Sequence, residues 1–395
     1  MIVKNGAATL GRALKSVQPI ADRILIGDTG SDDDSREIAR ALGAEVVDIP
    51  WEDDFSRARN RVLAMAQCDW IFVIDADEML DASGPEKIRP LLAAADVAAY
   101  DIVRWNYLCK TTTRCGDAPP TPNPGVLAEA AAFPAYVISF NTRLFRRRPE
   151  VYFEYAVHET IVHRLDALGL KHPPANFILH HLGQAEDAEA VRKAKFDLYH
   201  RLGIQKVAQQ PERAEGWFEL GLSELEHHRS AAAALPHFEH ARALEPGSAR
   251  NSLFCGICLT ALGRFNEAHA RIAEAYQLGS RSPVLFEALG DVYFHTQHYD
   301  QARAAYLGGG TSPLNAAKLG ACETVLGQPA QGLQRIRAAI EQAPAFAELY
   351  DILTAAAMLA GDTKLANESA EERRKFDAPQ PASQATEAQP ASQLA

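Results

Sequence analysis

Short apolar runs alternate with helical patterns along the first 184 residues of the chain. The runs that are apolar at successive positions are typical of strands buried on both faces, and they lie at 2–3, 23–26, 45–47 and 70–74. Apolar positions three or four residues apart predict helices between them, over 10–17, 35–42 and 56–66. The alternation predicts an α/β domain with a Rossmann-like, mostly parallel sheet and crossover helices.

The irregular segment 109–134 interrupts this alternation. Prolines and glycines break it up, and no helical or strand period runs across it. A loop of this length inside a domain is usually functional or disordered. Strand patterns return at 139–145 and 151–155, and a connecting helix is expected over 185–212.

A repeat with a helical period begins at Arg213. Glycines recur after apolar helix starts, at spacings of 35, 34 and 30 residues: Gly221, Gly256, Gly290 and Gly320. Turn glycines separate the paired helices at Gly263, Gly327 and Gly361. The pattern resembles the tetratricopeptide repeat, whose opening matches Trp217, Leu220 and Gly221, and it predicts an all-α solenoid of four to five repeats over 213–376. A tail rich in Ala, Gln, Pro and Ser, 377–395, is expected to be disordered.

Composition narrows the class of protein. Hydrophobic residues make up 47% of the 395-residue chain, enough for sizeable cores in two or three domains, and the net charge of −11 argues against nucleic acid as a partner. No apolar run is long enough to span a membrane, and no signal-peptide pattern opens the chain, so we expect a cytoplasmic protein. Cys255 and Cys258 are expected to be buried at helix crossings and not to bind metal.

Two carboxylates at the end of the fourth predicted strand, Asp75 and Asp77, give the strongest chemical signal. Ligands collect at the carboxyl ends of parallel strands, and two buried carboxylates so close together need a compensating charge. A divalent cation would supply that charge and could also bind diphosphate oxygens. The alternative is an ordinary acidic turn at the end of a strand.

Two further loops carry polar residues to the same edge of the predicted sheet. Asp28 ends the second strand, where its carboxylate could accept a hydrogen bond from a base or ribose, and Gly30 permits close backbone approach. The alternative there is a turn, possible because Asp, Gly and Ser favour turns. The third loop contains Asp54, Arg59 and Asn60; the acid suits a helix N-terminus, and the arginine could reach phosphate or remain on the surface.

These segments together resemble family 2 glycosyltransferases of the GT-A fold. The matches cover about Met1 to Gly183 and include Met1-Ile2-Val3-Lys4-Asn5, Asp28-Thr29-Gly30-Ser31, Asp54-Phe55-Ser56, Ala58-Arg59-Asn60 and Asp75-Ala76-Asp77. Arg143-Leu144-Phe145-Arg146, Val157-His158-Glu159 and His181-x-Gly183 follow in the order found in a bacterial subgroup. That subgroup includes lipopolysaccharide-core transferases and peptide S-glycosyltransferases.

The resemblance implies inverting transfer from a nucleotide-diphosphate sugar, a UDP-sugar being favoured, with Mn²⁺ or Mg²⁺ as cofactor. It implies donor contacts from Val3, Asn5, Asp28, Gly30, Asp54, Arg59, Asn60, Asp75 and Ala76. Metal contacts are expected from Asp77 and Asp75, with His181 as a further candidate. Glu159 is the expected base, and His158 is the alternative base or a metal ligand. Arg143 and Arg146 are candidates to neutralise phosphate, or they belong to a solvated basic turn.

Three hypotheses follow for the whole chain. In the first, the repeats hold a protein or peptide acceptor, because the concave face of a solenoid suits extended peptides. In the second, the acceptor is a lipopolysaccharide-core sugar. In the third, the protein is a repeat scaffold whose transferase domain is catalytically retired. Homo-oligomerisation through the repeats is compatible with each of the three.

Overall fold

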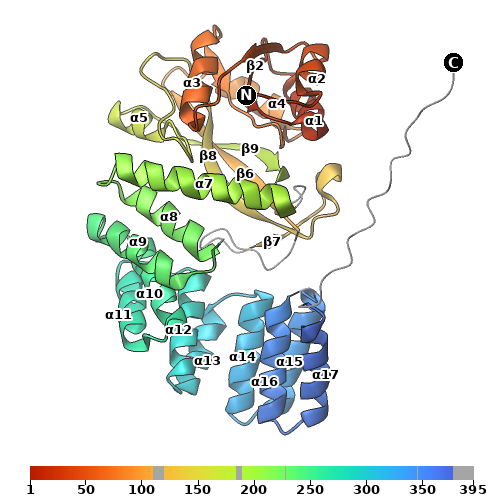
Figure 1. Cartoon of the computed structure of the whole chain (residues 1–395), viewed down its shortest axis with the longest axis vertical. Helices are drawn as coiled ribbons and strands as arrows, with labels where there is room; N and C mark the ends of the chain where they lie inside the picture. Colours follow the sequence, from red (N-terminus) through yellow and green to blue (C-terminus); the bar gives the residue numbers. More distant parts are fainter. Residues whose placement is uncertain (110–119, 184–188, 227, 345, 377–395) are drawn as a thin grey trace, which may run out of the picture. The chain divides into compact units, whose positions relative to one another are not determined.

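The computed structural model describes residues 1–109, 120–183, 189–226, 228–344 and 346–376 (Figure 1). The chain divides into two compact units, Met1–Ala288 and Leu289–Ala395. The predicted tail, 377–395, and residues 110–119 of the predicted irregular segment lie outside the described residues. Among the helices of the described ranges, none combines the length and the apolar stretch needed to cross a bilayer.

A small parallel sheet opens the first unit, in the order β1-β2-β3. Its strands and the helices that connect them are β1 (Ile2–Val3), α1 (Ala7–Val17), β2 (Leu25–Asp28), α2 (Ser35–Ala41), β3 (Glu45–Asp48) and α3 (Phe55–Met65). Ile26 packs in a cluster with Leu10 of α1, whereas Leu25 and Val47 pack against Val62 of α3. Helices therefore cover both faces of this sheet, which is why its strands are continuously apolar.

A glycine and an aspartate shape the two turns that flank α2. Gly43 ends the helix with a φ of +82°, a left-handed conformation that glycine adopts without strain. Asp33, and not Asp34, supplies the carboxylate at the start of the helix: it accepts hydrogen bonds from the backbone N–H of Ser35 at 3.0 Å and of Ala7 at 2.9 Å. One side chain thus joins the starts of α1 and α2.

A second, mixed sheet follows, in the order β4-β8-β6-β9-β5, with β7 beside β8. Its strands are β4 (Trp70–Phe72), β5 (Glu78–Leu80), β6 (Ala99–Leu108), β7 (Thr121–Pro122), β8 (Ala135–Arg146) and β9 (Pro174–His181). The prediction that the run 70–74 extends a parallel sheet is wrong, because β4 pairs antiparallel with β8. An apolar run reports burial on both faces and carries no information on strand direction.

Two other local predictions need correction. The described part of the segment 109–134 contains β7 and a short 3₁₀ helix, Ala128–Ala130. The expected strand 151–155 is irregular and forms a single bridge, between Glu154 and Thr160. Two short helices, α4 (Gly84–Leu91) and α5 (Val162–Ala167), complete this part of the chain, and Ile88 of α4 packs into the core of the second sheet.

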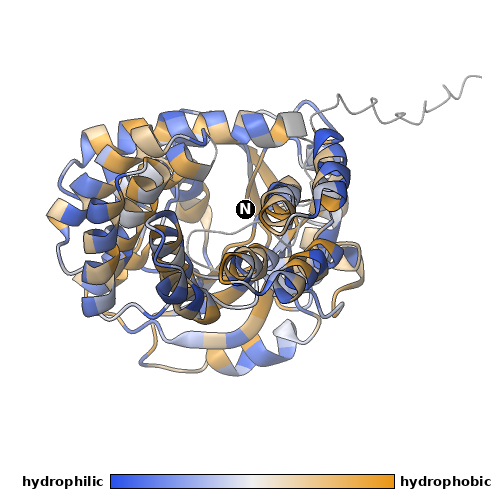
Figure 2. Ribbon diagram, turned by 90° about the horizontal axis from the view of Figure 1, so that it is seen from below, coloured by the Kyte–Doolittle hydropathy of each residue, from blue (hydrophilic) through white to orange (hydrophobic). Residues whose placement is uncertain are grey.

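Helices make up the rest of the described chain. A long helix, α7 (Glu189–Gln209), lies within the expected connecting segment. It is followed in the first unit by α8 (Ala214–Glu226), α9 (Ala231–Leu244), α10 (Ala249–Ala261) and α11 (Phe265–Gln277). The helix α12 (Pro283–His295) contains the boundary between units, and the second unit continues with α13 (Tyr299–Gly308), α14 (Pro313–Val325), α15 (Pro329–Gln342), α16 (Ala347–Leu359) and α17 (Thr363–Arg374). Hydrophobic and hydrophilic positions alternate around these helices (Figure 2).

The recurring glycines lie where paired helices touch, as the repeat pattern predicts. A Cβ added to Gly221 would lie 2.7 Å from the ring of Phe238, and one added to Gly256 would lie 2.6 Å from Ile272. In the second unit, a Cβ on Gly320 would lie 2.6 Å from the carbonyl oxygen of Gly332. The glycines therefore permit the close helix approach typical of tetratricopeptide repeats. Cys255 and Cys258 of α10 are fully buried, which confirms their predicted packing role.

Candidate functional site

The acidic turn after β4 is closed by its own backbone. The N–H of Asp75 donates to Oε2 of Glu78 at 2.9 Å, and the N–H of Glu78 donates to the carbonyl of Asp75 at 3.1 Å. Glu78 is fully buried, and Arg104 of β6 reaches it at 3.2 Å. The sequence motif therefore ends on a carboxylate that holds the turn in place and is itself neutralised.

Asp75 lies between two arginines. Its Oδ1 accepts from Nη2 of Arg59 at 2.7 Å and its Oδ2 accepts from Nη2 of Arg143 at 2.9 Å. Burial by itself would raise the pKa of Asp75, but the two guanidinium groups hold it well below the usual range. Asp75 is therefore ionised, and the two guanidinium groups compensate its charge.

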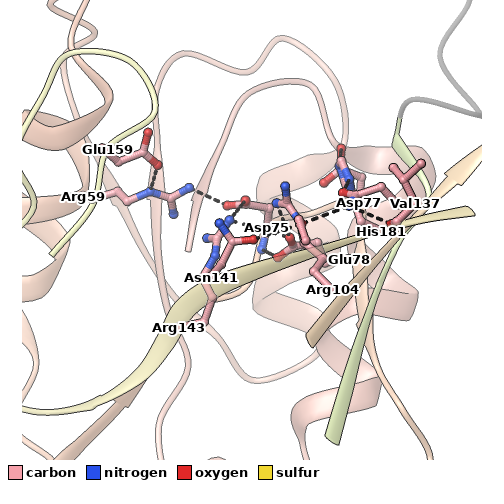
Figure 3. A network of polar contacts seen from close by, with 12 residues as sticks. Arg59, Asp75, Asp77, Glu78, Arg104, Val137, Asn141, Arg143, Glu159 and His181 are labelled. Atoms are coloured by element: carbon pink, nitrogen blue, oxygen red, sulfur yellow. Dashed lines mark hydrogen bonds and ion pairs between the residues drawn. The ribbon is translucent and has the colours of Figure 1, made fainter. Parts of the chain in front are cut away.

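Glu159 joins this network through Arg59. The Nε atom of Arg59 donates to Oε1 of Glu159 at 2.5 Å, so the guanidinium bridges Glu159 and Asp75 (Figure 3). Burial would lower the pKa of Arg59, but the two carboxylates raise it above its ordinary value. The predicted base and the first predicted metal ligand thus share one buried cation, on α3.

Asp77 and His181 form a separate pair. Oδ2 of Asp77 lies 3.5 Å from Nε2 of His181, and the other ring nitrogen, Nδ1, lies 2.9 Å from Oδ1 of Asn106 (Figure 3). The amide nitrogen of Asn106 donates to the carbonyl of Val137, so its Oδ1 must accept from Nδ1 of His181. In the neutral ring, Nε2 therefore directs a lone pair toward a carboxylate oxygen. A cation bound between the two atoms would relieve this repulsion.

Strand register explains this juxtaposition. In the antiparallel pair of β5 and β9, Glu78 is opposite His181, which brings the histidine beside Asp77. In the parallel pair of β6 and β9, Asn106 is opposite the same histidine. Gly183 then passes so close to Asp77 that an added Cβ would lie 2.8 Å from its Cγ and overlap its Oδ2. The His-x-Gly motif thus places a histidine beside Asp77 and follows it with the residue type that leaves room for the carboxylate.

The three predicted metal ligands are not all brought together. Among the described residues, Asp75, Asp77 and His181 do not place three donor atoms within 4.8 Å of one another. Asp75 faces the arginines instead, as described above. Asp77 and His181 are the pair whose geometry fits a cation.

The loop after β2 presents a carboxylate with one free oxygen. Oδ1 of Asp28 accepts from the N–H groups of Gly30 and Ser31, at 3.0 and 2.9 Å, and from Arg36 at 2.6 Å. Burial would raise the pKa of Asp28, but these hydrogen bonds and the charge of Arg36 lower it. Its Oδ2 is buried, and no group in the described part of the chain donates to it. The residue therefore offers an ionised acceptor without a partner.

The first loop supports the second. Oδ1 of Asn5 accepts from the N–H of Asp32 at 2.9 Å, and the N–H of Asn5 donates to Ser31 at 2.9 Å. Val3 is buried in the core of the parallel sheet. Ala76 lies against Gly6, where an added Cβ would be 3.2 Å from that of Ala76. Asn5 thus braces the loop that follows β2, whereas Val3 and Ala76 pack within the fold.

Three other predicted site residues make structural contacts. Asp54 caps α3 by accepting from the N–H of Arg57 at 2.9 Å. Asn60 bonds both the N–H and the carbonyl of Phe153, at 2.8 Å each. Arg146 donates to the carbonyls of Val97 and Ala94. Their polar groups are used within the fold and do not point to a ligand.

Helix α7 adds residues that the sequence patterns did not reveal. The ring of Tyr199 lies 5.8 Å from that of Phe55 and 5.9 Å from that of the exposed His158, and burial and the charge of Glu159 raise its pKa. His180 is packed, as expected for one of the two adjacent histidines, and its Nδ1 lies 2.9 Å from the hydroxyl of Tyr107. A charged residue inside a long strand was the signal for Arg104; Asn106 and Tyr199 had none.

The parallel first sheet, with helices on both faces, defines an α/β domain. Residues 1–125 match the family model of glycosyl transferase family 2. The N-terminal part of this chain is therefore a glycosyl transferase family 2 region, as the ordered motifs predicted.

Curated relatives agree with this match. A TPR repeat-containing protein of Synechococcus elongatus is 34% identical over 173 residues, 44% of this chain and 37% of the relative. An uncharacterized glycosyltransferase of Rickettsia felis is 36% identical over 102 residues, 25% of this chain and 35% of the relative. The SPbeta prophage-derived glycosyltransferase SunS of Bacillus subtilis is 26% identical over 181 residues, 45% of this chain and 36% of the relative. The chain thus spans little more than a third of each relative.

Solved structures with helical repeats also resemble the chain. The APC/C hetero-tetramer Cut9-Hcn1 gives a TM-score of 0.42 at 16% identity, covering 46% of this chain and 37% of that one. The pilus biogenesis factor PilW gives 0.41 at 15% identity, covering 49% and 91%. The repeat architecture of this chain rests on its own helix pairs and crossing glycines.

Proposed function

We propose that the protein is a metal-dependent, inverting glycosyltransferase that moves a sugar from a nucleotide-diphosphate sugar, preferably a UDP-sugar, to an acceptor held by the repeats. The observation that carries the proposal is the apposition of Asp77 and His181 beside the ion-paired Asp75, with Asp77 and Asp75 inside the segment 1–125 that matches glycosyl transferase family 2. The retired-scaffold alternative is disfavoured because each acidic group of this site is intact and positioned.

Asp77 and His181 fit a divalent cation. Two ligand atoms bound at about 2.1 Å lie roughly 3.0 to 3.4 Å apart in octahedral or tetrahedral geometry, close to the 3.5 Å observed. The hydrogen bond from Nδ1 to Asn106 leaves Nε2 as the free ligand atom. Mn²⁺ or Mg²⁺ bound there would offset the charge of the departing diphosphate.

Other residues of the chain bind and orient the donor. Oδ2 of Asp28 is the acceptor for a base or ribose donor group, since burial makes an unpartnered carboxylate oxygen costly. Arg59 and Arg143 carry positive charge beside the proposed site of Asp77 and His181, where diphosphate oxygens would lie. Entry of the donor would exchange part of the Asp75 ion pairing for phosphate contacts.

Glu159 is the proposed base. Its carboxylate is held by Arg59, which fixes its position relative to Asp75. In that role it would take the proton of the acceptor as the nucleophile attacks, on the side of the sugar opposite the diphosphate. His158 is exposed and its ring contacts that of Tyr199, so Glu159 is preferred as the base.

A protein or peptide is the proposed acceptor class, because a repeat array follows the catalytic region and such arrays bind extended peptides. A lipopolysaccharide-core sugar is the alternative. Transfer by a chain lacking the second unit, Leu289–Ala395, distinguishes them. Hydrolysis of the donor should persist, whereas transfer to a protein acceptor should fall; unchanged transfer would favour an acceptor that does not use those repeats.

The central test is hydrolysis and transfer from a panel of nucleotide sugars, with and without Mn²⁺. Asp77→Asn should abolish metal-dependent donor binding, measured calorimetrically, while Glu159→Gln should retain binding and lose transfer. The matched control is Asp22→Asn, a carboxylate that precedes β2 and takes no part in the site. Absence of binding and turnover with every donor would overturn the proposal, and full activity of Glu159→Gln would overturn the base assignment.

A further inference from the structure

A second group of metal-ligand side chains lies between α7 and the end of α8. It consists of His200, Glu224 and His228, and one donor atom of each lies within 4.8 Å of the other two. Among the described residues this is the single His, Cys, Asp or Glu trio that meets that criterion. None of the three belongs to the sugar-donor site or to a motif of the family 2 region, which ends before them.

The spacing within the trio fits a small transition-metal ion. Nε2 of His200 lies 3.5 Å from Oε1 of Glu224, and Nδ1 of His228 lies 3.1 Å from Oε2 of the same carboxylate. Ligand atoms bound tetrahedrally at about 2.0 to 2.1 Å are roughly 3.3 to 3.4 Å apart. The carboxylate therefore already lies close to ligand distance from both imidazoles.

The orientation of His200 is set by a neighbour. Its Nδ1 lies 3.2 Å from the hydroxyl oxygen of Ser223, which leaves Nε2 toward Glu224. This is how metal-binding histidines are usually fixed, with one ring nitrogen hydrogen-bonded and the other on the metal. The two histidine rings approach each other at 4.4 Å between centroids.

The trio opens onto a cleft that leaves room for a further ligand. A cleft of about 340 Å³ is lined by His200, Glu224 and His237 and otherwise by mostly apolar side chains. A three-residue set with a fourth position open to water is the arrangement that zinc adopts outside fully closed structural sites.

We propose that His200, Glu224 and His228 bind one divalent transition-metal ion of the zinc class. The ion would join the middle of α7 to the end of α8. His200 directly follows Tyr199, whose ring lies against Phe55 of α3 and against His158. The ion would therefore fix α7 in the register that keeps Tyr199 over the donor site.

The test is calorimetric titration of the full chain with Zn²⁺, in an Asp77→Asn background that removes the proposed catalytic site. One equivalent should bind, and His200→Gln or His228→Gln should weaken it at least tenfold. Glu224→Gln, which keeps the side-chain shape, should do the same. His269→Gln, an exposed histidine on α11 outside the trio, is the matched control and should bind as the background does.

Two further readouts keep the proposal independent of sugar transfer and of folding. Co²⁺ should give the intense visible absorption of a four-coordinate site in the background protein and not in the His228→Gln variant. Zn²⁺ should raise the thermal midpoint of the background protein by mass action, and far-UV circular dichroism should show that each variant is folded. Equal Zn²⁺ affinity in the background and in both histidine variants, or no binding by the background, would overturn the proposal.

Discussion

The α-carbon of Gly183 passes so close to Asp77 that a Cβ at this position would lie 2.8 Å from the carboxyl carbon. The backbone of the same segment also holds the aspartate, because the N–H of Leu182 donates to the carbonyl of Asp77 at 3.0 Å. Leu182 and Gly183 are the two residues that follow His181 in the sequence. The chain that carries the histidine therefore also fixes the partner carboxylate.

Gly183→Ala should disrupt the proposed cation site of Asp77 and His181 without replacing either of those side chains. The added methyl group must displace Asp77, so metal-dependent donor binding should weaken by about tenfold or more, as when the support of a metal ligand is lost. Calorimetry with a nucleotide sugar and Mn²⁺ measures this. The control is Gly11→Ala in α1, where the nearest atom to the added Cβ is at an ordinary 3.8 Å. Equal binding by both variants would contradict the account of the His-x-Gly motif.

Arg59→Leu should destabilise the first unit as well as inactivate it. Removal of the guanidinium leaves Glu159 without its ion-pair partner and Asp75 with Arg143 alone. Breaking a buried ion pair on one side costs about 3 to 5 kcal/mol. Arg57→Leu on the same helix removes an exposed arginine and should cost about 1 kcal/mol or less. Urea unfolding compares the two, and equal losses of unfolding free energy would refute the buried network.

The pH dependence of stability should include a contribution from His172. Its ring lies 3.0 Å from Asp166 and 3.2 Å from Asp101, and although burial lowers its pKa, the two carboxylates raise it overall. A raised folded-state pKa stabilises the fold below the unfolded value of about 6.5, and the gain is lost as pH rises through the folded value. The thermal midpoint of the parent should therefore exceed that of His172→Asn most at acidic pH. A difference that grows with pH would have the wrong sign.

Gly320→Ala should destabilise the second unit. Its Cβ would press on the backbone carbonyl of Gly332, which cannot move away as a flexible side chain can. Overpacking of this kind costs about 1 to 3 kcal/mol. Ala355→Ser, at an exposed position of α16, should have little effect. Thermal unfolding followed by circular dichroism separates the two variants, and equal midpoints would show that the helices part freely at this crossing.

Local chemistry was predicted from the sequence where one segment contains it. The end of β2 at Asp28, the cap on α3 from Asp54 and the crossing glycines each depend on a short run of neighbours. The packing of the α10 cysteines was predicted for the same reason. These features need no knowledge of how distant strands pair.

The arrangement of the acids could not be predicted in this way. Asp77 and His181 meet through the register of β5 and β9, and Asp75 turns to Arg59 and Arg143 because β8 pairs with β4. Spacing along the chain does not encode that pairing. The sequence therefore grouped Asp75, Asp77 and His181 as one set of predicted ligands. In the fold, Asp75 is ion-paired with two arginines, and Asp77 lies beside His181.

The boundary between the two compact units falls inside α12, so the catalytic region and the first helix pairs belong to one unit. Lys206 of α7 shows the connection: it pairs with Glu219 of α8 at 2.6 Å and lies 4.5 Å from the ring centroid of Tyr155. A recombinant fragment cut before α7 would lose Lys206 and expose the ring of Tyr155 to water. For protein engineering, the whole first unit, Met1–Ala288, should therefore be kept together. The repeats of the second unit, Leu289–Ala395, are the ones to exchange.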